Sequence, residues 1–177
     1  MHICKTKLSL DQTIDRMQSI GFVPTMGALH DGHISLIKKS LRENDQTVCS
    51  IFVNPTQFNN SQDFEKYPHT IEQDQKMLLD VGCNVLLLPS VQEMYPEGLQ
   101  TQSFDFGPVA QVMEGKHRPG HFDGVGTIVS KLFDFVQPTK AYFGEKDYQQ
   151  LCIIRKMVEI QKRNIHIVAC ETLRETD

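Results

Sequence analysis

Short apolar runs alternate with amphipathic helical segments along most of this chain, and this alternation restricts the possible folds more than any other feature. Five runs predict strands: residues 20–25, 47–53, 84–88, 140–144 and 165–170. The clearest helical face, in a segment that ends before Pro138, consists of Val125, Ile128, Val129, Leu132 and Val136. Strands that alternate with helices predict an α/β fold, here a Rossmann-like doubly wound parallel sheet with helices on both faces.

Shorter signals add further elements. Two capping boxes, at 9–12 and 70–73, predict helices that end near Gly21 and at Gly82. The apolar face of the first helix consists of Leu10, Ile14 and Met17. We also expect a strand at 103–106 and a helix at 147–163. The polar segment 54–68 is too long for a simple connection, which indicates a functional loop.

The composition predicts one well-buried domain, or one domain with an incomplete second, since 177 residues include 40% hydrophobic and 23% charged residues. A net charge of −4 disfavours a nucleic-acid partner, which requires a basic face. Five cysteines without a CxxC pair predict reduced thiols and neither disulfides nor a zinc site. The chain has no leader and no apolar run near the ~20 residues of a membrane span, so we expect a cytoplasmic protein without a membrane partner.

The most informative motif is TMGALHDGH at 25–33, between the apolar run 20–25 and a helical segment. A helix N-terminus offers unpaired N–H groups and a partial positive charge, which suit a triphosphate. Gly27 and Gly32 are expected to let phosphate approach the backbone, while His30 and His33 donate to it. The alternative is that each histidine merely caps the helix. Because the motif follows a strand, it belongs at the sheet edge where open α/β sheets bind ligands.

Two other strand ends carry polar side chains. Gln57, in NPTQF, offers a donor and an acceptor to a carboxylate or hydroxyl substrate, unless it is simply solvated. In GEKDYQQ at 144–150, Lys146 suits phosphate, Asp147 suits a helix cap or a ribose hydroxyl, and Gln150 faces the same cleft. A capped surface helix is the alternative for this second corner.

Two further candidates involve charged residues. Lys116, Arg118 and His121 surround Pro119-Gly120, which predicts either a mobile anion-binding lid or a solvated basic loop. Asp74, near the start of its helix, either complements the helix dipole or lies near Mg²⁺.

Four motifs, TMGALHDGH, FVNPTQF, EGKHRPGHFDGV and FGEKDYQQL, occur in this order, and the chain from about Gly21 onward resembles the pantothenate synthetase (pantoate–β-alanine ligase) family. That family belongs to nucleotidyltransferases with a His-x-Gly-His signature, here residues 30–33. The resemblance implies a homodimer that uses ATP with Mg²⁺ and forms pantothenate in two steps. Pantoate attacks the α-phosphorus of ATP to give pantoyl adenylate and pyrophosphate, and β-alanine then displaces AMP.

The resemblance also implies roles for individual residues. The catalytic residues, which steady the phosphates, would be His30, His33 and Lys146. The ATP-binding residues would be Met26, Gly32, His33, Gly144, Lys146 and Asp147. The pantoate-binding residues would be Pro24, Met26, Gln57, Val125, Ile128 and Gln150. Arg118 and His121 would contribute to the basic loop.

The chain departs from the family pattern at 171–177, where the family continues into a Ser-Ser-Arg-Asn loop and a smaller C-terminal domain. We therefore expect 1–170 to form the nucleotide- and pantoate-binding domain and 171–177 to begin a linker, with the smaller domain absent. A polypeptide of this length is expected to bind substrate and to turn over poorly. Two alternatives remain: another His-x-Gly-His enzyme, such as an aminoacyl-tRNA synthetase fragment or a CoA-pathway adenylyltransferase, and a non-catalytic binding or dimerisation module.

Overall fold

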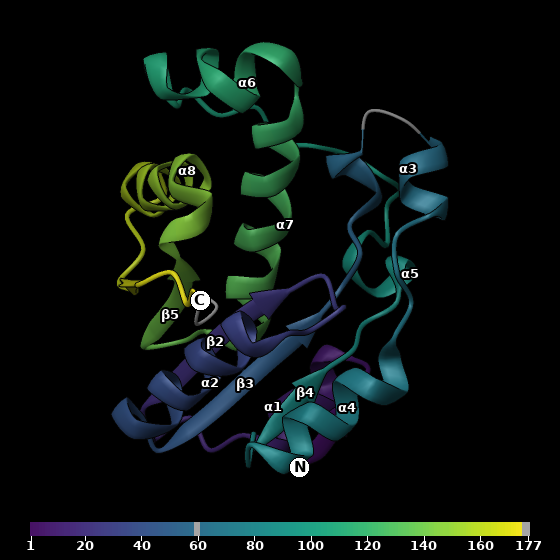
Figure 1. Cartoon of the computed structure of the whole chain (residues 1–177), viewed down its shortest axis with the longest axis vertical. Coiled ribbons are helices and arrows are strands. Elements are labelled where there is room, and N and C mark those ends of the chain that lie inside the picture. The colour runs from purple at the N-terminus through teal and green to yellow at the C-terminus, as the bar shows by residue number, and fades with distance from the viewer. Residues whose placement is uncertain (59–60, 175–177) are drawn as a thin grey trace.

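One parallel sheet forms the centre of the computed structural model, which describes residues 1–58 and 61–174 (Figure 1). Within these residues, six strands pair in the order β1-β4-β3-β2-β5-β6, and each neighbouring pair is parallel. Their bounds are β1 His2–Cys4, β2 Ile20–Thr25, β3 Gln46–Ile51, β4 Val85–Leu87, β5 Lys140–Gly144 and β6 His166–Cys170. The winding reverses between β2 and β5, because β3 and β4 follow on one side of β2 and β6 follows on the other.

Helices connect these strands. The α-helices are α1 Lys7–Thr13, α2 Asp31–Glu43, α3 Ser61–Glu65, α4 Ile71–Asp80, α5 Val91–Met94, α6 Met113–His117, α7 His121–Val136 and α8 Tyr148–Ile160. Short 3₁₀ turns occur at η1 Pro55–Gln57, η2 Gly107–Gln111 and η3 Glu145–Asp147. The predicted α/β fold with a doubly wound parallel sheet is confirmed.

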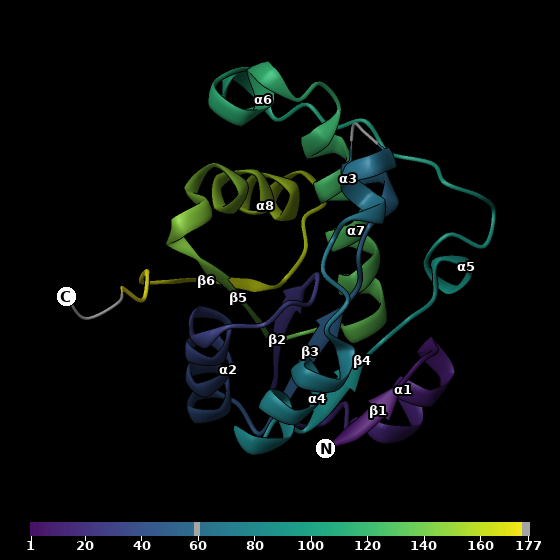
Figure 2. The same ribbon diagram turned by 45° about the vertical axis from the view of Figure 1, so that its right-hand side comes forward.

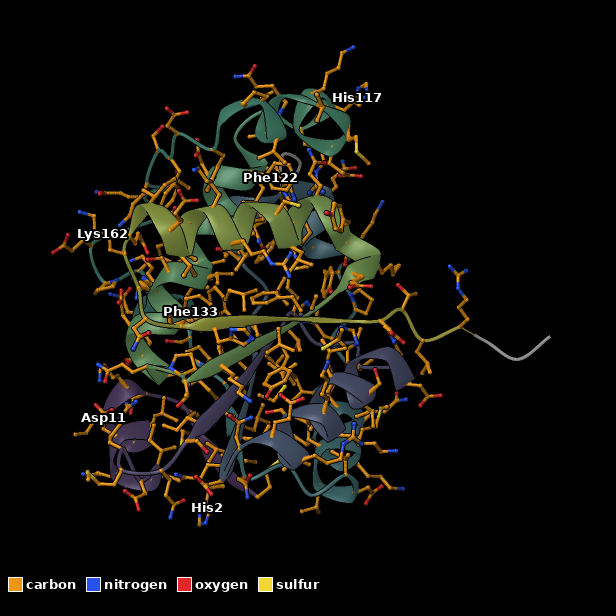
Figure 3. The ribbon with its side chains drawn as sticks, turned by 90° about the vertical axis from the view of Figure 1, so that its left-hand side faces the viewer. His2, Asp11, His117, Phe122, Phe133 and Lys162 are labelled. Carbon is orange, nitrogen blue, oxygen red and sulfur yellow. The ribbon has the colours of Figure 1, made fainter. Side chains whose placement is uncertain are left out.

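The helices cover both faces of the sheet, as predicted. On one face, α2 and α4 bury apolar side chains that include Ile37 and Leu78. On the other face, α1, α7 and α8 pack on the strands, and Phe22 of β2 meets the Phe133 ring edge-on at a centroid distance of 6.1 Å. Figure 2 shows α2 and α4 on one side of the strands and α7 and α8 on the other. Figure 3 shows α8 crossing α7 between the levels of Phe122 and Phe133.

The strands and helices with strong apolar patterns were predicted well. β2 and β5 have the predicted bounds, and the predicted apolar face of α7 is buried. β3, β4 and β6 differ from prediction by one or two residues at their ends. The helix expected at 147–163 is shorter, because η3 forms the first turn and α8 ends at Ile160. The three-residue strand β1 was not predicted.

Two local predictions are wrong, and a third segment contains short helices. The capping box of α1 lies three residues earlier, since the Thr6 hydroxyl accepts from the Ser9 N–H at 3.1 Å, and Met17 is 93% exposed beyond the helix. Residues 103–106 form no strand, because the Phe104 N–H donates to an Asp123 carboxylate oxygen at 3.0 Å instead of to a neighbouring strand. The polar segment 54–68 contains η1 and α3, although residues 59–60 lie outside the described ranges.

Two global expectations concern cysteines and membranes. Cys4, Cys49, Cys83 and Cys170 are buried as free thiols, and Cys152 is partly buried. Burial raises the pKa of the Cys83 thiol to about 11, so this thiol packs as a small neutral side chain. Among the helices that the structure describes, none combines the length and apolarity that crossing a bilayer requires.

Candidate functional site

A cavity of about 440 Å³ opens at the carboxyl ends of β2 and β5, where the winding of the sheet reverses. This is the position at which open α/β sheets bind ligands. From the predicted phosphate side it is lined by Met26, His30, Gly32, His33, Gly144, Lys146 and Asp147. From the predicted acid side it is lined by Pro24, Gln57, Val125, Ile128 and Gln150. The fold therefore gathers these residues from four separate stretches of sequence into one pocket.

The two histidines of the motif interact with the start of α2 through Nδ1. His30 is the N-cap residue, and its Nδ1 accepts from the Gly32 N–H at 3.1 Å. The Nδ1 of His33 accepts in turn from the His30 N–H at 3.4 Å, and the ring centroids lie 4.1 Å apart. Because both Nδ1 atoms are acceptors, each neutral ring carries its proton on Nε2. The histidines thus cap the helix and still keep one N–H donor each, so the two predicted roles are compatible.

The glycines of the motif have a structural role that differs from the predicted one. A Cβ on Gly32 would lie 2.8 Å from Cε1 of His30, so only glycine lets that ring fold back over the helix start. Gly27 has a φ of +85°, and a Cβ there would lie 3.1 Å from Oδ2 of Asp74. These glycines allow the loop to adopt its own conformation, besides leaving space for a ligand.

His33 is neutral at physiological pH. Burial, helped by electrostatic interactions with the neighbouring His30 and Lys146 side chains, lowers the pKa of this imidazole to about 4, although Asp74 and Asp147 act in the opposite direction. A neutral ring donates through Nε2 without requiring an acidic medium. An anion bound in the pocket would favour the protonated form of this ring.

Asp74 lies behind the motif loop and does not line the pocket. Its side chain is 1% exposed, and its two oxygens accept from the N–H groups of Ala28 and Leu29 at 3.0 and 2.8 Å. Thr70, the N-cap residue of α4, makes no side-chain cap bond and donates to Oδ2 at 3.2 Å instead. This geometry does not favour the Mg²⁺ role considered for Asp74. In the described part of the chain, no group of three or more acidic, histidine or cysteine side chains is arranged to hold a metal.

Arg118 and His121 also lie outside the pocket lining, which argues against the predicted anion-binding lid. Arg118 Nη2 donates to the backbone carbonyl of Gln57 at 3.1 Å, and Nδ1 of His121 lies 3.1 Å from the same oxygen. Burial lowers the pKa of His121, so the neutral ring donates to this carbonyl. The two residues therefore fix the turn that presents Gln57. Lys116 is exposed, and Figure 3 shows the neighbouring His117 at the end of the molecule far from the sheet.

The turn η1 is fixed from the helix α7 as well. Asn54 is fully buried and donates to the Gly124 carbonyl at 3.3 Å, while its oxygen accepts from the Tyr95 hydroxyl at 2.8 Å. A Cβ on Gly124 would lie 2.6 Å from the Thr56 carbonyl oxygen, so glycine permits this close approach of α7 to η1.

Several pocket residues were not predicted. Val129 and Leu132 continue the α7 face of Val125 and Ile128 at helical spacing, so their position could have been inferred from the sequence. The other unpredicted residues have no sequence pattern that indicates a pocket, and only the fold shows that they line it: Leu36, Phe52, Tyr67, Phe143, Glu171, Thr172 and Leu173. The pocket thus has a polar half, with two imidazole donors, an ammonium and a helix N-terminus, beside an apolar half that carries two amides.

Comparisons with known proteins identify the family of this chain. A family model described as pantoate-beta-alanine ligase matches residues 2–177. A pantothenate synthetase of Flavobacterium psychrophilum is 54% identical over 172 residues, which are 97% of this chain and 61% of the relative. The chain thus spans about three fifths of the length of that curated relative.

Two solved structures are also similar to this chain over almost its whole length. The pantothenate synthetase from Thermus thermophilus has a TM-score of 0.94 and 46% identity, over 99% of this chain and 63% of its own. A pantoate-beta-alanine ligase from Francisella tularensis, solved with beta-gamma ATP and beta-alanine, has a TM-score of 0.94 and 45% identity, over 99% of this chain and 68% of its own.

Proposed function

This chain belongs to the pantoate–β-alanine ligase family, and from that premise we propose that the protein condenses pantoate with β-alanine at the expense of ATP. The products are pantothenate, AMP and pyrophosphate. The observation that carries the proposal is the two-sided pocket, in which donors suited to phosphate lie beside an apolar wall with two amides. The Francisella tularensis relative, whose structure contains a form of ATP and β-alanine, supports the same ligands here.

The first chemical step is adenylation. A carboxylate oxygen of pantoate attacks the α-phosphorus of ATP, an O–P bond forms, and the bond to the leaving pyrophosphate breaks. In the second step, the amine of β-alanine attacks the acyl carbon, a C–N bond forms, AMP leaves and the amine loses a proton. Neither step needs a nucleophilic side chain, because in-line transfer at phosphorus depends on positioning and on charge stabilisation.

The polar half of the pocket is suited to the developing phosphate charge. His30 and His33 direct Nε2–H donors from the start of α2, and Lys146 supplies a full positive charge. We assign the remaining nucleotide contacts to Met26, Gly32, Gly144 and Asp147.

The apolar half is suited to a small branched hydroxy acid. Gln57 and Gln150 offer amide donors and acceptors to its carboxylate and hydroxyl groups, while Pro24, Met26, Val125 and Ile128 contact its carbon atoms. An apolar wall also excludes water, which would otherwise hydrolyse the acyl adenylate.

Mg²⁺ fits this site only as a companion of the nucleotide. The described residues include no cluster of three ligand side chains, and Mg²⁺ is commonly held through substrate phosphates with few protein ligands. When bound, it would neutralise phosphate charge.

Three further parts of the proposal concern the whole protein. We expect a cytoplasmic homodimer, and we expect a polypeptide limited to residues 1–177 to bind pantoate or ATP but to turn over slowly. Release of AMP in the presence of pantoate, ATP and β-alanine measures that turnover directly, and a rate equal to that of the full-length protein would refute the last expectation.

The deciding experiment is exchange of labelled pyrophosphate into ATP by the full-length protein. We expect exchange that depends on pantoate, is lost in His33→Ala and is retained in His117→Ala, which removes an exposed imidazole on α6. Exchange with a different acid would identify another adenylyl-transferring enzyme. No exchange with any acid, together with no ATP binding by calorimetry, would indicate a binding or dimerisation module.

A further inference from the structure

We propose that Asp74 is a positioning residue that holds the loop at 26–29, and that it thereby places His30 and His33 for the phosphates. The inference rests on the proposed function for its effect on ATP. Its structural part, the fixing of the loop by a buried carboxylate, stands on hydrogen bonds within this chain.

The first observation is the set of bonds that Asp74 makes. Its carboxylate is buried at 1% exposure, and it accepts from two consecutive N–H groups, those of Ala28 and Leu29. Thr70 donates a third hydrogen bond, the second one to Oδ2. The three bonds together fix the orientation of the carboxylate. Charge-assisted bonds of this kind are stronger than bonds between neutral groups, and losing one partner leaves a buried donor unsatisfied.

The second observation is the unusual backbone that these bonds hold. Gly27 and Ala28 both lie in the left-handed region, with φ of +85° and +52°. Alanine rarely adopts this conformation unless the surroundings impose it. The N–H of Ala28 is itself bonded to Asp74, which links the strained residue directly to the carboxylate. The loop continues two residues later into His30, the N-cap of α2.

The third observation is where Asp74 lies relative to the pocket. Gly27 and Ala28 line the cavity, whereas Asp74 does not, so the carboxylate acts from behind the loop. Its negative charge also opposes the effect of burial on the pKa of His33. Asp74 thus affects the phosphate side of the pocket without contacting a ligand.

The test uses Asp74→Asn in the full-length protein, with Glu72→Gln as the matched control. Asparagine keeps the shape but has one acceptor oxygen, so at most one of the two loop N–H groups keeps a good acceptor. Glu72→Gln removes the same charge from an exposed position on the same helix. We expect Asp74→Asn to weaken ATP binding by about tenfold or more, a loss typical of a charged hydrogen bond. Pantoate affinity should fall much less, because only Met26 among the proposed pantoate contacts belongs to this loop, whereas Gln57 and Gln150 are held by other elements.

The outcomes separate the possibilities. Unchanged ATP affinity in a folded Asp74→Asn protein would overturn the proposal, and so would an equal loss of ATP and pantoate affinity, which indicates general disruption. If that variant does not fold, Thr70→Val decides, since it removes one bond that orients the carboxylate. We expect it to weaken ATP binding about threefold with a smaller effect on pantoate, and unchanged ATP affinity would count against the positioning role.

A measurement without ligand distinguishes this proposal from the proposed function. Amide hydrogen exchange at Ala28 and Leu29 should accelerate by about tenfold or more in Asp74→Asn and stay at the wild-type rate in Glu72→Gln. If the wild-type protein binds neither ATP nor pantoate, the proposed function fails while faster exchange still supports the fixing of the loop. Unchanged exchange rates would refute the inference whatever the protein binds.

Discussion

The low pKa of His33 predicts a pH-dependent loss of stability that a single substitution should remove. The folded protein holds this pKa at about 4, whereas an exposed histidine titrates near 6.5. Below pH 6.5 the unfolded chain therefore binds a proton at this ring that the folded protein excludes. The stabilising contribution is fully present above pH 6.5 and is lost progressively as the pH falls toward 4.

The linkage relation sets the size of the effect. Between pH 7 and pH 5, a pKa change from 6.5 to about 4 corresponds to roughly 2 kcal/mol of unfolding free energy. Because the ring is partly accessible to solvent in the pocket, we reduce the expected value to about 1 kcal/mol.

Urea unfolding of the wild-type protein and of His33→Gln, at pH 7 and at pH 5, measures this difference. Glutamine does not titrate, and the interactions that it fails to reproduce are lost at both pH values, so they cancel in the double difference. His121, whose pKa burial also lowers, is present in both proteins and cancels too. Between pH 7 and pH 5, we expect the unfolding free energy of the wild-type protein to fall by about 1 kcal/mol more than that of the variant. A double difference below about 0.3 kcal/mol would show that His33 is not held neutral by the fold.

Three other substitutions test the pocket. Gly124→Ala places a Cβ 2.6 Å from the Thr56 carbonyl oxygen, so urea unfolding should show a loss of about 1–3 kcal/mol in unfolding free energy. An unchanged urea midpoint would mean that α7 and η1 separate freely. Arg118→Met removes the donor to the Gln57 carbonyl but keeps an apolar stem, so the KM for pantoate should rise several-fold while the KM for ATP stays constant. Equal rises for both substrates would contradict the clamp on Gln57. Lys146→Met should weaken ATP binding about tenfold or more and change unfolding stability by less than about 0.5 kcal/mol, and normal ATP affinity would exclude its phosphate role.

The sequence predicts the fold well where a single physical effect determines each element. Strands β2 and β5 are apolar runs buried on both faces, so their bounds follow from hydrophobicity alone. The face of α7 follows from helical periodicity in the same way. Alternation of such elements then restricts the topology, because parallel strands need crossover connections.

The prediction is wrong where local patterns compete with side-chain partners from elsewhere. Residues 103–106 alternate like a strand, but the Phe104 N–H bonds to Asp123 of α7, and no neighbouring strand is available. At the start of α1, both Thr6 and Ser9 have hydroxyl groups that can cap a helix, and the sequence alone does not decide between them. The bond from the Thr6 hydroxyl to the Ser9 N–H settles the choice.

The same distinction explains what could be inferred about the pocket. His30 and His33 are recognisable as candidates because the groups proposed to face the ligand and the helix that carries them are adjacent in sequence. The groups that hold those elements in place are distant: Asp74 contacts Ala28 across 46 residues, and Arg118 contacts Gln57 across 61. In both contacts one partner is a backbone group: every residue has a carbonyl, and every residue except proline has an N–H, so the side chain at that position gives no signal. A basic residue such as Arg118 therefore suggests an anion site when it is taken alone, although its partners are the Gln57 carbonyl and the Glu114 carboxylate of this chain. A carboxylate such as Asp74 suggests a metal in the same way, although its partners are two backbone N–H groups and the Thr70 hydroxyl. The residues that bind a ligand can be found by motif, whereas the residues that position them require the fold.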